Sequence, residues 1–79
     1  MYSYPIDYDQ FTTEEIIVIV EFLALVEEAN TNKVDAHVLS KKHQDFRKVV
    51  NSISLEKQID RAFEKTSGYS IYKTIQQYK

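Results

Sequence analysis

Residues 12–30, "TTEEIIVIVEFLALVEEAN", decide how this chain folds. The β-branched run 16–20 would suit a buried strand on propensity alone. The flanking residues favour a helix, because Thr12 stands three residues before Glu15, which is the spacing of a capping box. Acidic side chains in a first turn also suit the positive end of a helix dipole, and the apolar stretch is longer than a usual strand. We therefore predict a helix over about residues 13–29.

This predicted helix is apolar around most of its circumference. Glu14, Glu21 and Glu28 fall on one narrow polar stripe when the residues are placed at 3.6 per turn. A helix of this kind is either the central element of a small bundle or half of a subunit interface. We expect the central position, and a homodimer formed through this helix is the alternative.

The rest of the chain has little of the residue chemistry that tight hairpins need. Its 79 residues contain one glycine and one proline, whereas hairpin loops use glycine or asparagine at positive φ. Helices joined by short polar links are therefore favoured. We predict three further helices, over about residues 36–50, 55–66 and 70–78.

Helix boundaries follow from capping residues in the links. Asp35 is a candidate N-cap for the second helix and Ser54 for the third. Gly68 can adopt the left-handed conformation that ends a helix. The predicted fold class is all-α: one domain over residues 1–79, a compact bundle of three main helices and a short C-terminal helix. Residues 1–12 form an extended N-terminal arm.

Composition limits the cell compartment and the chemistry. There is no cysteine, so disulfides, thiolate metal sites and a cysteine nucleophile are excluded, and a reduced intracellular setting is favoured. No apolar run approaches the roughly 20 residues that cross a bilayer, and the start of the chain lacks the cationic residues of a secretory signal. We expect a cytoplasmic protein that does not enter the membrane.

Charge is distributed unevenly along the chain. Residues 1–30 contain seven acidic residues and no lysine or arginine, while the remainder contains all ten basic residues and five acidic ones. Attraction between the first helix and the later ones is one explanation, and a basic face for an anionic partner such as nucleic acid is the other. The candidate residues for that face lie on the second helix: Lys41, Lys42, Arg47 and Lys48.

The outer face of the third helix carries an acidic ridge beside a basic one. Lys57 with Asp60, and Arg61 with Glu64, are neighbours of opposite sign three residues apart. We expect these pairs, together with Glu56 in the same acidic ridge, to form a solvated, self-neutralised surface.

No constellation of residues indicates catalysis, a metal site or a cofactor. His37 and His43 are six residues apart, which places them about 120° apart on one helix rather than on a common face. Asp7 and Asp9 lack the glycine and the closing glutamate of a calcium loop. A chain with one glycine has no glycine-rich phosphate loop. We predict that the protein is not an enzyme, with no catalytic, metal-binding or cofactor-binding residue and no cofactor.

Several segments together resemble a known family. They are "YSYPIDYDQFTTEEI" at residues 2–16, "VEEAN" at 26–30, "EKQI" at 56–59 and "FEKTSGYSIY" at 63–72. The chain resembles uncharacterised protein family 0223, small proteins of Gram-positive bacteria, over nearly its whole length. The resemblance implies a compact all-helical fold and no established activity, and it carries over no catalytic or ligand-binding residue.

Tyrosine-bearing segments near the two ends of the chain suggest a binding surface. A tyrosine side chain suits both the rim of a core and an interface anchor. If the arm packs against the "SGYSIY" segment, five residues form one partly exposed cluster: Tyr4, Pro5, Ile6, Tyr69 and Tyr72. We therefore predict a small non-catalytic interaction module that binds another protein through this cluster. The alternative is a weak nucleic-acid or anionic-partner binder that uses the basic residues of the second helix.

Overall fold

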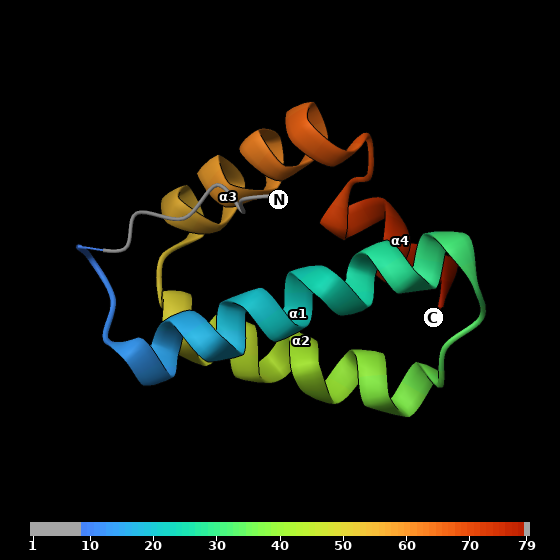
Figure 1. Cartoon of the computed structure of the whole chain (residues 1–79), viewed down its shortest axis with the longest axis horizontal. Coiled ribbons are helices and arrows are strands. Elements are labelled where there is room, and N and C mark those ends of the chain that lie inside the picture. Colours follow the sequence, from blue (N-terminus) through green and yellow to red (C-terminus); the bar gives the residue numbers. More distant parts are fainter. Residues whose placement is uncertain (1–8, 79) are drawn as a thin grey trace.

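Helix α1 (Thr13–Thr31) is the longest element of the computed structural model, which describes residues 9–78 (Figure 1). The predicted capping box is confirmed. The Oγ1 atom of Thr12 accepts a hydrogen bond from the backbone N–H of Glu15 at 3.2 Å, and Glu15 Oε1 accepts one from the N–H of Thr12 at 2.9 Å. Two exposed backbone donors of the first turn are thereby satisfied.

The other elements are α2 (Ala36–Val50), α3 (Ile53–Ser67) and α4 (Ile71–Gln77). The described residues form no strand, so the all-α prediction is confirmed. Asp35 caps α2, with its Oδ1 atom accepting from the N–H of His37 at 2.7 Å. Gly68 ends α3 at a φ of 85°, a conformation that costs glycine little.

The start of α3 differs from the prediction. Ser52, and not Ser54, is its N-cap, because Ser52 Oγ accepts a hydrogen bond from the N–H of Leu55 at 3.3 Å. Asn51 closes α2 in the left-handed region, with a φ of 44°, which asparagine tolerates better than most residues. The link between α2 and α3 is therefore only two residues long.

Each of these four helices packs against two others. Helix α1 contacts α2 and α4, while α3 contacts α2 and α4 (Figure 1). Within residues 9–78, eleven apolar residues form the buried core: Ile19, Phe22, Leu23, Val26, Ala29, Leu39, Phe46, Val50, Ile59, Phe63 and Ile71. Five of them belong to α1, more than to any other helix, although Ile17 of the same helix is 51% exposed. A homodimer through α1 stays a prediction.

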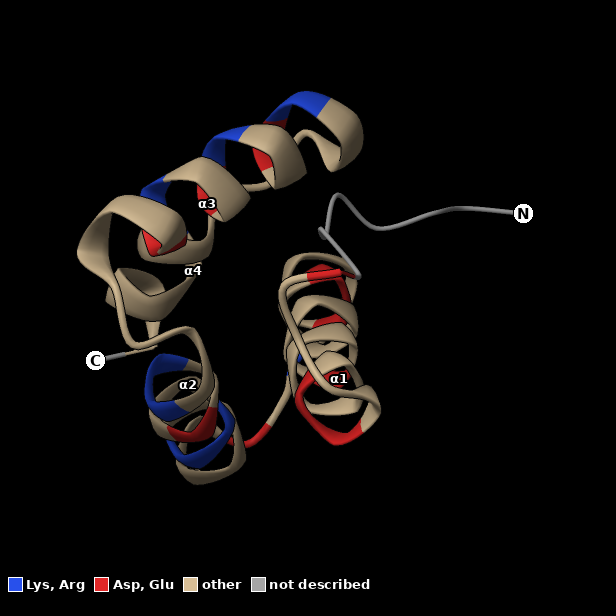
Figure 2. Ribbon diagram, turned by 90° about the vertical axis from the view of Figure 1, so that its left-hand side faces the viewer, with Lys and Arg blue, Asp and Glu red and all other residues tan. Residues whose placement is uncertain are grey.

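Figure 2 shows acidic residues along α1 and basic residues on the neighbouring α2. Lys42 Nζ of α2 lies 3.0 Å from Glu21 Oε2 of α1, so attraction between these elements contributes to their packing. The radius of gyration is 11.7 Å, close to the roughly 12 Å expected of a compact chain of this length. Among the described residues, none of the helices combines the length and apolar character of a membrane span.

The predicted arm lies mostly outside the described residues. Tyr4, Pro5 and Ile6 are among those not described. Packing of the arm against the "SGYSIY" segment therefore stays a prediction.

Candidate functional site

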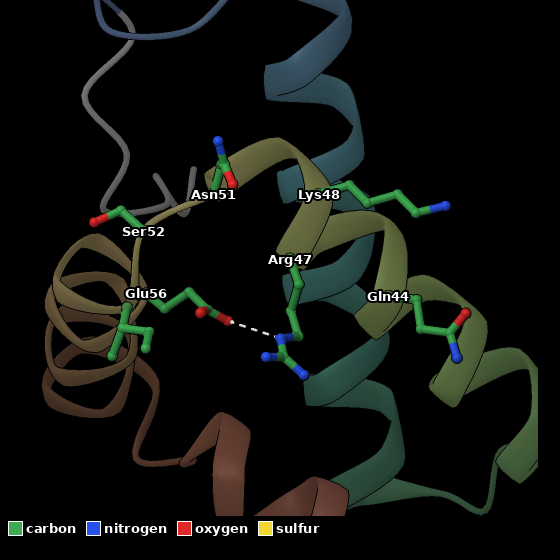
Figure 3. A pocket seen from close by; sticks show the side chains of 7 residues that line it. Gln44, Arg47, Lys48, Asn51, Ser52 and Glu56 are labelled. Carbon is green, nitrogen blue, oxygen red and sulfur yellow. Dashed lines mark ion pairs between the residues drawn. The ribbon is translucent and has the colours of Figure 1, made fainter.

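Two adjoining open hollows lie at the surface, one of about 520 Å³ between α2 and α3 and one of about 450 Å³ between α2, α3 and α4. Both hollows are lined by Gln44, Arg47, Ile53 and Glu56. We call the two together the α2–α4 groove, and Figure 3 shows the first of them. The remaining residues of the groove are Lys48, Asn51 and Ser52 in the first hollow, and Ser40, His43, Tyr72, Ile75 and Gln76 in the second.

The short link between α2 and α3 creates one apolar wall of this groove. Val50, just before the link, is buried in the core, whereas Ile53, the first residue of α3, is 68% exposed. Because the chain turns within two residues, Ile53 cannot reach the core that Val50 joins. Its side chain instead lines both hollows.

A buried carboxylate lies beside this apolar wall. The Glu56 side chain is 8% exposed, and its Oε1 atom lies 3.7 Å from Nε of Arg47 (Figure 3). A buried charge needs a partner of opposite sign, because desolvation of an isolated carboxylate costs several kcal/mol. The Arg47 side chain is 61% exposed, so the positive partner of this pair faces solvent and the negative one does not.

Tyr72 lines the second hollow from α4 and is 39% exposed. Burial raises the pKa of its phenol, and the negative charges of Glu56 and Asp60 raise it further, while Arg47 acts in the opposite direction. The phenol therefore lies in the electrostatic field of the groove's charged residues. Tyr69, the other described member of the predicted cluster, is half-buried against the core and does not line the groove.

The four basic residues predicted on α2 do not share one environment. Lys42 pairs with Glu21, and Arg47 pairs with Glu56. Lys41 and Lys48 are exposed, and Lys48 lines the groove. Two of the four positive charges are therefore already matched by acidic side chains.

The prediction that the outer face of α3 is solvated and self-neutralised is wrong for two of its residues. Glu56 is buried, and Asp60 Oδ1 accepts a hydrogen bond from the backbone N–H of Ile71 at 2.8 Å. Within residues 9–78 neither predicted pair forms, because the two ion pairs there join α2 to α1 and to α3. The sequence carried a signal for Glu56, which lies three residues before Ile59 and seven before Phe63, and thus on the buried face of α3.

The histidines have ordinary structural surroundings. His37 is exposed in the first turn of α2. His43 is half-buried, and its ring stacks on Phe22 with 5.5 Å between ring centroids. Within residues 9–78 no cluster of three or more histidine, aspartate or glutamate side chains could hold a metal ion.

Comparison with known proteins identifies relatives along the whole chain. A family model described as "Uncharacterised protein family (UPF0223)" matches residues 1–79. A UPF0223 protein of Streptococcus mutans is 47% identical over 78 residues, which cover 99% of this chain and 84% of the relative. A UPF0223 protein of Enterococcus faecalis is 42% identical over the same length, with the same coverage of both chains. No solved structure matches this chain.

Proposed function

Because this chain belongs to the UPF0223 family, whose description names no activity, we propose its function from the α2–α4 groove. The proposed role is that of a small interaction module that binds a segment of another protein in this groove. We propose that the role is non-catalytic and that the protein acts in the cytoplasm. The occupant is a segment that presents bulky apolar side chains.

The observation that carries this proposal is the exposure of Ile53 beside Tyr72. Ile53 is 68% exposed and Tyr72 is 39% exposed, and both line the second hollow. Removing apolar surface from water contributes about 25 cal/mol per Å². Tyrosine is also one of the residue types most often found as an energetic anchor in protein interfaces.

The polar lining of the groove suits a peptide partner. Gln44 and Gln76 contribute side-chain amides from α2 and α4, and each amide can both donate and accept hydrogen bonds. A bound segment has backbone N–H and C=O groups that must be satisfied once they are removed from water. The groove therefore combines apolar anchors with groups that can satisfy a partner's backbone.

The second candidate function is binding of an anionic partner through Lys41, Lys42, Arg47 and Lys48. The exposure of Lys41 and Lys48 supports it, and the ion pairs of Lys42 and Arg47 weaken it. Binding to nucleic acid falls steeply as salt rises, because neutralised phosphates release counterions. Docking of apolar side chains has no such dependence on salt.

The experiment is a pull-down from lysate of the source cells, divided into nuclease-treated and untreated halves and washed at low and high salt. It compares the wild type with Ile53→Ser and Tyr72→Ala. Val38→Ala is the matched control, because Val38 is 46% exposed on α2 but does not line the groove. Circular dichroism verifies that each variant is folded.

The expected result is a protein that survives nuclease and high salt, is lost with both groove variants and is retained by Val38→Ala. Retention of the same protein by folded Ile53→Ser and Tyr72→Ala would exclude the groove as its binding site. Capture of nuclease-sensitive, salt-labile material alone would favour the lysines of α2.

A further inference from the structure

We propose that the α2–α4 groove selects acidic segments, with the carboxylate of a partner's Asp or Glu side chain bound by Arg47. This inference rests on the proposed function and adds a chemical class of partner to it. An apolar side chain next to that carboxylate lies against Ile53 and Tyr72.

The charges that face the groove from solvent are positive. Arg47 and Lys48 both line the first hollow and both are exposed. Among residues 9–78 the acidic residue of the lining is Glu56, and its side chain is 8% exposed. An approaching segment therefore meets the two cations before the buried acid. Attraction between these cations and an acidic segment speeds association, and repulsion disfavours a basic segment.

Arg47 retains hydrogen-bonding capacity despite its ion pair. The distance of 3.7 Å from its Nε atom to Glu56 Oε1 exceeds that of a good hydrogen bond. The Arg47 side chain also donates no hydrogen bond to another group within residues 9–78. A guanidinium carries five N–H donors in a planar fork, so one edge can face Glu56 while the two terminal nitrogens bind a second carboxylate.

The position of Arg47 places that second carboxylate next to apolar surface. Arg47 lines both hollows, as does Ile53, and the second hollow adds Tyr72 and Ile75 from α4. In Figure 3 the guanidinium of Arg47 extends from α2 into the pocket toward Glu56 of α3. A segment with an acidic residue and a neighbouring bulky apolar residue fits both features at once.

The test begins with a displayed library of random short peptides selected on the immobilised full chain. We expect enrichment of peptides that contain Asp or Glu beside Leu, Ile or an aromatic residue. One enriched peptide is then synthesised in its acidic form and in an analogue that carries the corresponding amide, Asn or Gln. Both are titrated against the wild type and against variants of the groove.

The informative variant is Arg47→Gln combined with Glu56→Gln. It leaves no unpaired buried charge, so it protects the fold, and its net charge equals that of the wild type. Replacing the acid by the amide should weaken binding to the wild type by about tenfold or more, as expected of a lost charge-assisted hydrogen bond. With the double variant, the preference for the acidic peptide should fall to what the remaining cation, Lys48, provides through general attraction, as measured in a double-mutant cycle.

Arg47→Lys separates a specific contact from general attraction. It keeps the charge but lacks the planar fork, so the preference for the acidic peptide should fall markedly if the carboxylate is bound in two-pronged geometry. An undiminished preference for the acid in the double variant would overturn the role of Arg47.

Failure of this inference can be told apart from failure of the proposed function. Enrichment of peptides without acidic residues, bound by the wild type and lost with Tyr72→Ala, would overturn acidic selection and leave the interaction groove standing. If no enriched peptide depends on Ile53 or Tyr72, both proposals are wrong.

Discussion

Asp60 attaches the first turn of α4 to α3 through a single carboxylate oxygen. Its Oδ1 atom accepts a hydrogen bond from the N–H of Ile71 at 2.8 Å. Burial raises the pKa of Asp60, and the charge of Glu64 adds to the effect, while the hydrogen bonds from Ile71 and Ser70 and the charge of Lys73 oppose it. The fold therefore accommodates a neutral group at this position better than a charged one.

Folding raises the pKa of Asp60, so the protonated carboxyl group stabilises the folded state relative to the charged one. This stabilisation is fully present below the unfolded pKa, which is near 4 for an aspartate. It is lost as the pH rises through the folded pKa. We therefore expect Asp60→Asn, which keeps an acceptor oxygen without the charge, to be at least as stable as the wild type at neutral pH. Its advantage should shrink as the pH falls toward about 4. Urea unfolding at a series of pH values measures this difference.

Asp60→Ala is the control for the hydrogen bond itself. It leaves the N–H of Ile71 without its acceptor, so it should be less stable than Asp60→Asn by about 1–2 kcal/mol at every pH, since neither variant carries a charge at this position. If Asp60→Asn loses as much stability as Asp60→Ala at neutral pH, then the charge, and not the acceptor oxygen, is what α4 needs.

Tyr72 reports the electrostatics of the groove. Its pKa lies above the ordinary value for a tyrosine, first through burial and then through Glu56. Replacing Glu56 with Gln removes a negative charge that disfavours the phenolate, so the pKa of Tyr72 should fall toward its ordinary value. Ultraviolet titration of the wild type and of Glu56→Gln, each compared with its Tyr72→Phe counterpart, isolates this group.

Glu64→Gln is a matched control, because Glu64 is exposed on α3 and is not among the residues that shift the pKa of Tyr72. Equal shifts in Glu56→Gln and Glu64→Gln would contradict a local contribution from the buried carboxylate.

At the scale of elements, α4 persists because other helices hold it. It has seven residues, fewer than an isolated helix needs to be stable in water. Asn30 of α1 donates a hydrogen bond to the buried Thr74 Oγ1 at 2.8 Å. The hydroxyl of Tyr78 donates to the carbonyl of Ala29 at 3.2 Å and accepts from the N–H of Val34 at 3.3 Å. Tyr78 thereby joins the end of α4 to the last turns of α1 and to the link that leads into α2.

We expect Tyr78→Phe to lower the free energy of unfolding by about 1 kcal/mol, because it leaves a partly buried N–H and C=O without their partner. The midpoint of urea unfolding should move while the slope stays constant. Tyr72→Phe removes the same atom from an exposed ring and should have little effect. If Tyr78→Phe loses no more stability than Tyr72→Phe, the hydroxyl of Tyr78 does not stabilise the attachment of α4.

At the scale of the whole molecule, one buried aromatic ring packs between α1 and α2. Phe22 of α1 is fully buried and stacks on Phe46 and His43 of α2, with centroid distances of 4.8 and 5.5 Å. Stacked aromatic pairs contribute about 0.5–1.5 kcal/mol beyond their buried area. A chain of this size has a total stability of only about 4–12 kcal/mol.

Phe22→Leu should therefore lower the free energy of unfolding by at least about 1 kcal/mol, and helical circular dichroism and tyrosine fluorescence should still report one coincident transition. Ile17→Ala on the same helix is the control. Ile17 is 51% exposed, so its truncation should change stability by no more than about 0.5 kcal/mol. Separate transitions from the two probes would show that the helices unfold as independent units.

Local chemistry in the sequence determined most of the fold. Thr12 with Glu15, Asp35 and Gly68 act through neighbouring backbone groups, so their roles can be predicted from spacing alone. The length and apolar character of residues 12–30 likewise predicted the helix that contributes most residues to the core.

Only the tertiary structure decided the groove and the uses of its charged residues. Several contacts depend on how the helices cross in space. They are the contacts of Glu56 with Arg47, of Asp60 with Ile71 and of Tyr78 with Ala29. Helical periodicity gives the direction of a side chain around its own axis, and it does not give the partner that lies there. The exposure of Ile53 likewise depends on which serine caps α3. Ser52 and Ser54 are equally good capping residues, and the use of Ser54 would have made the link between α2 and α3 longer.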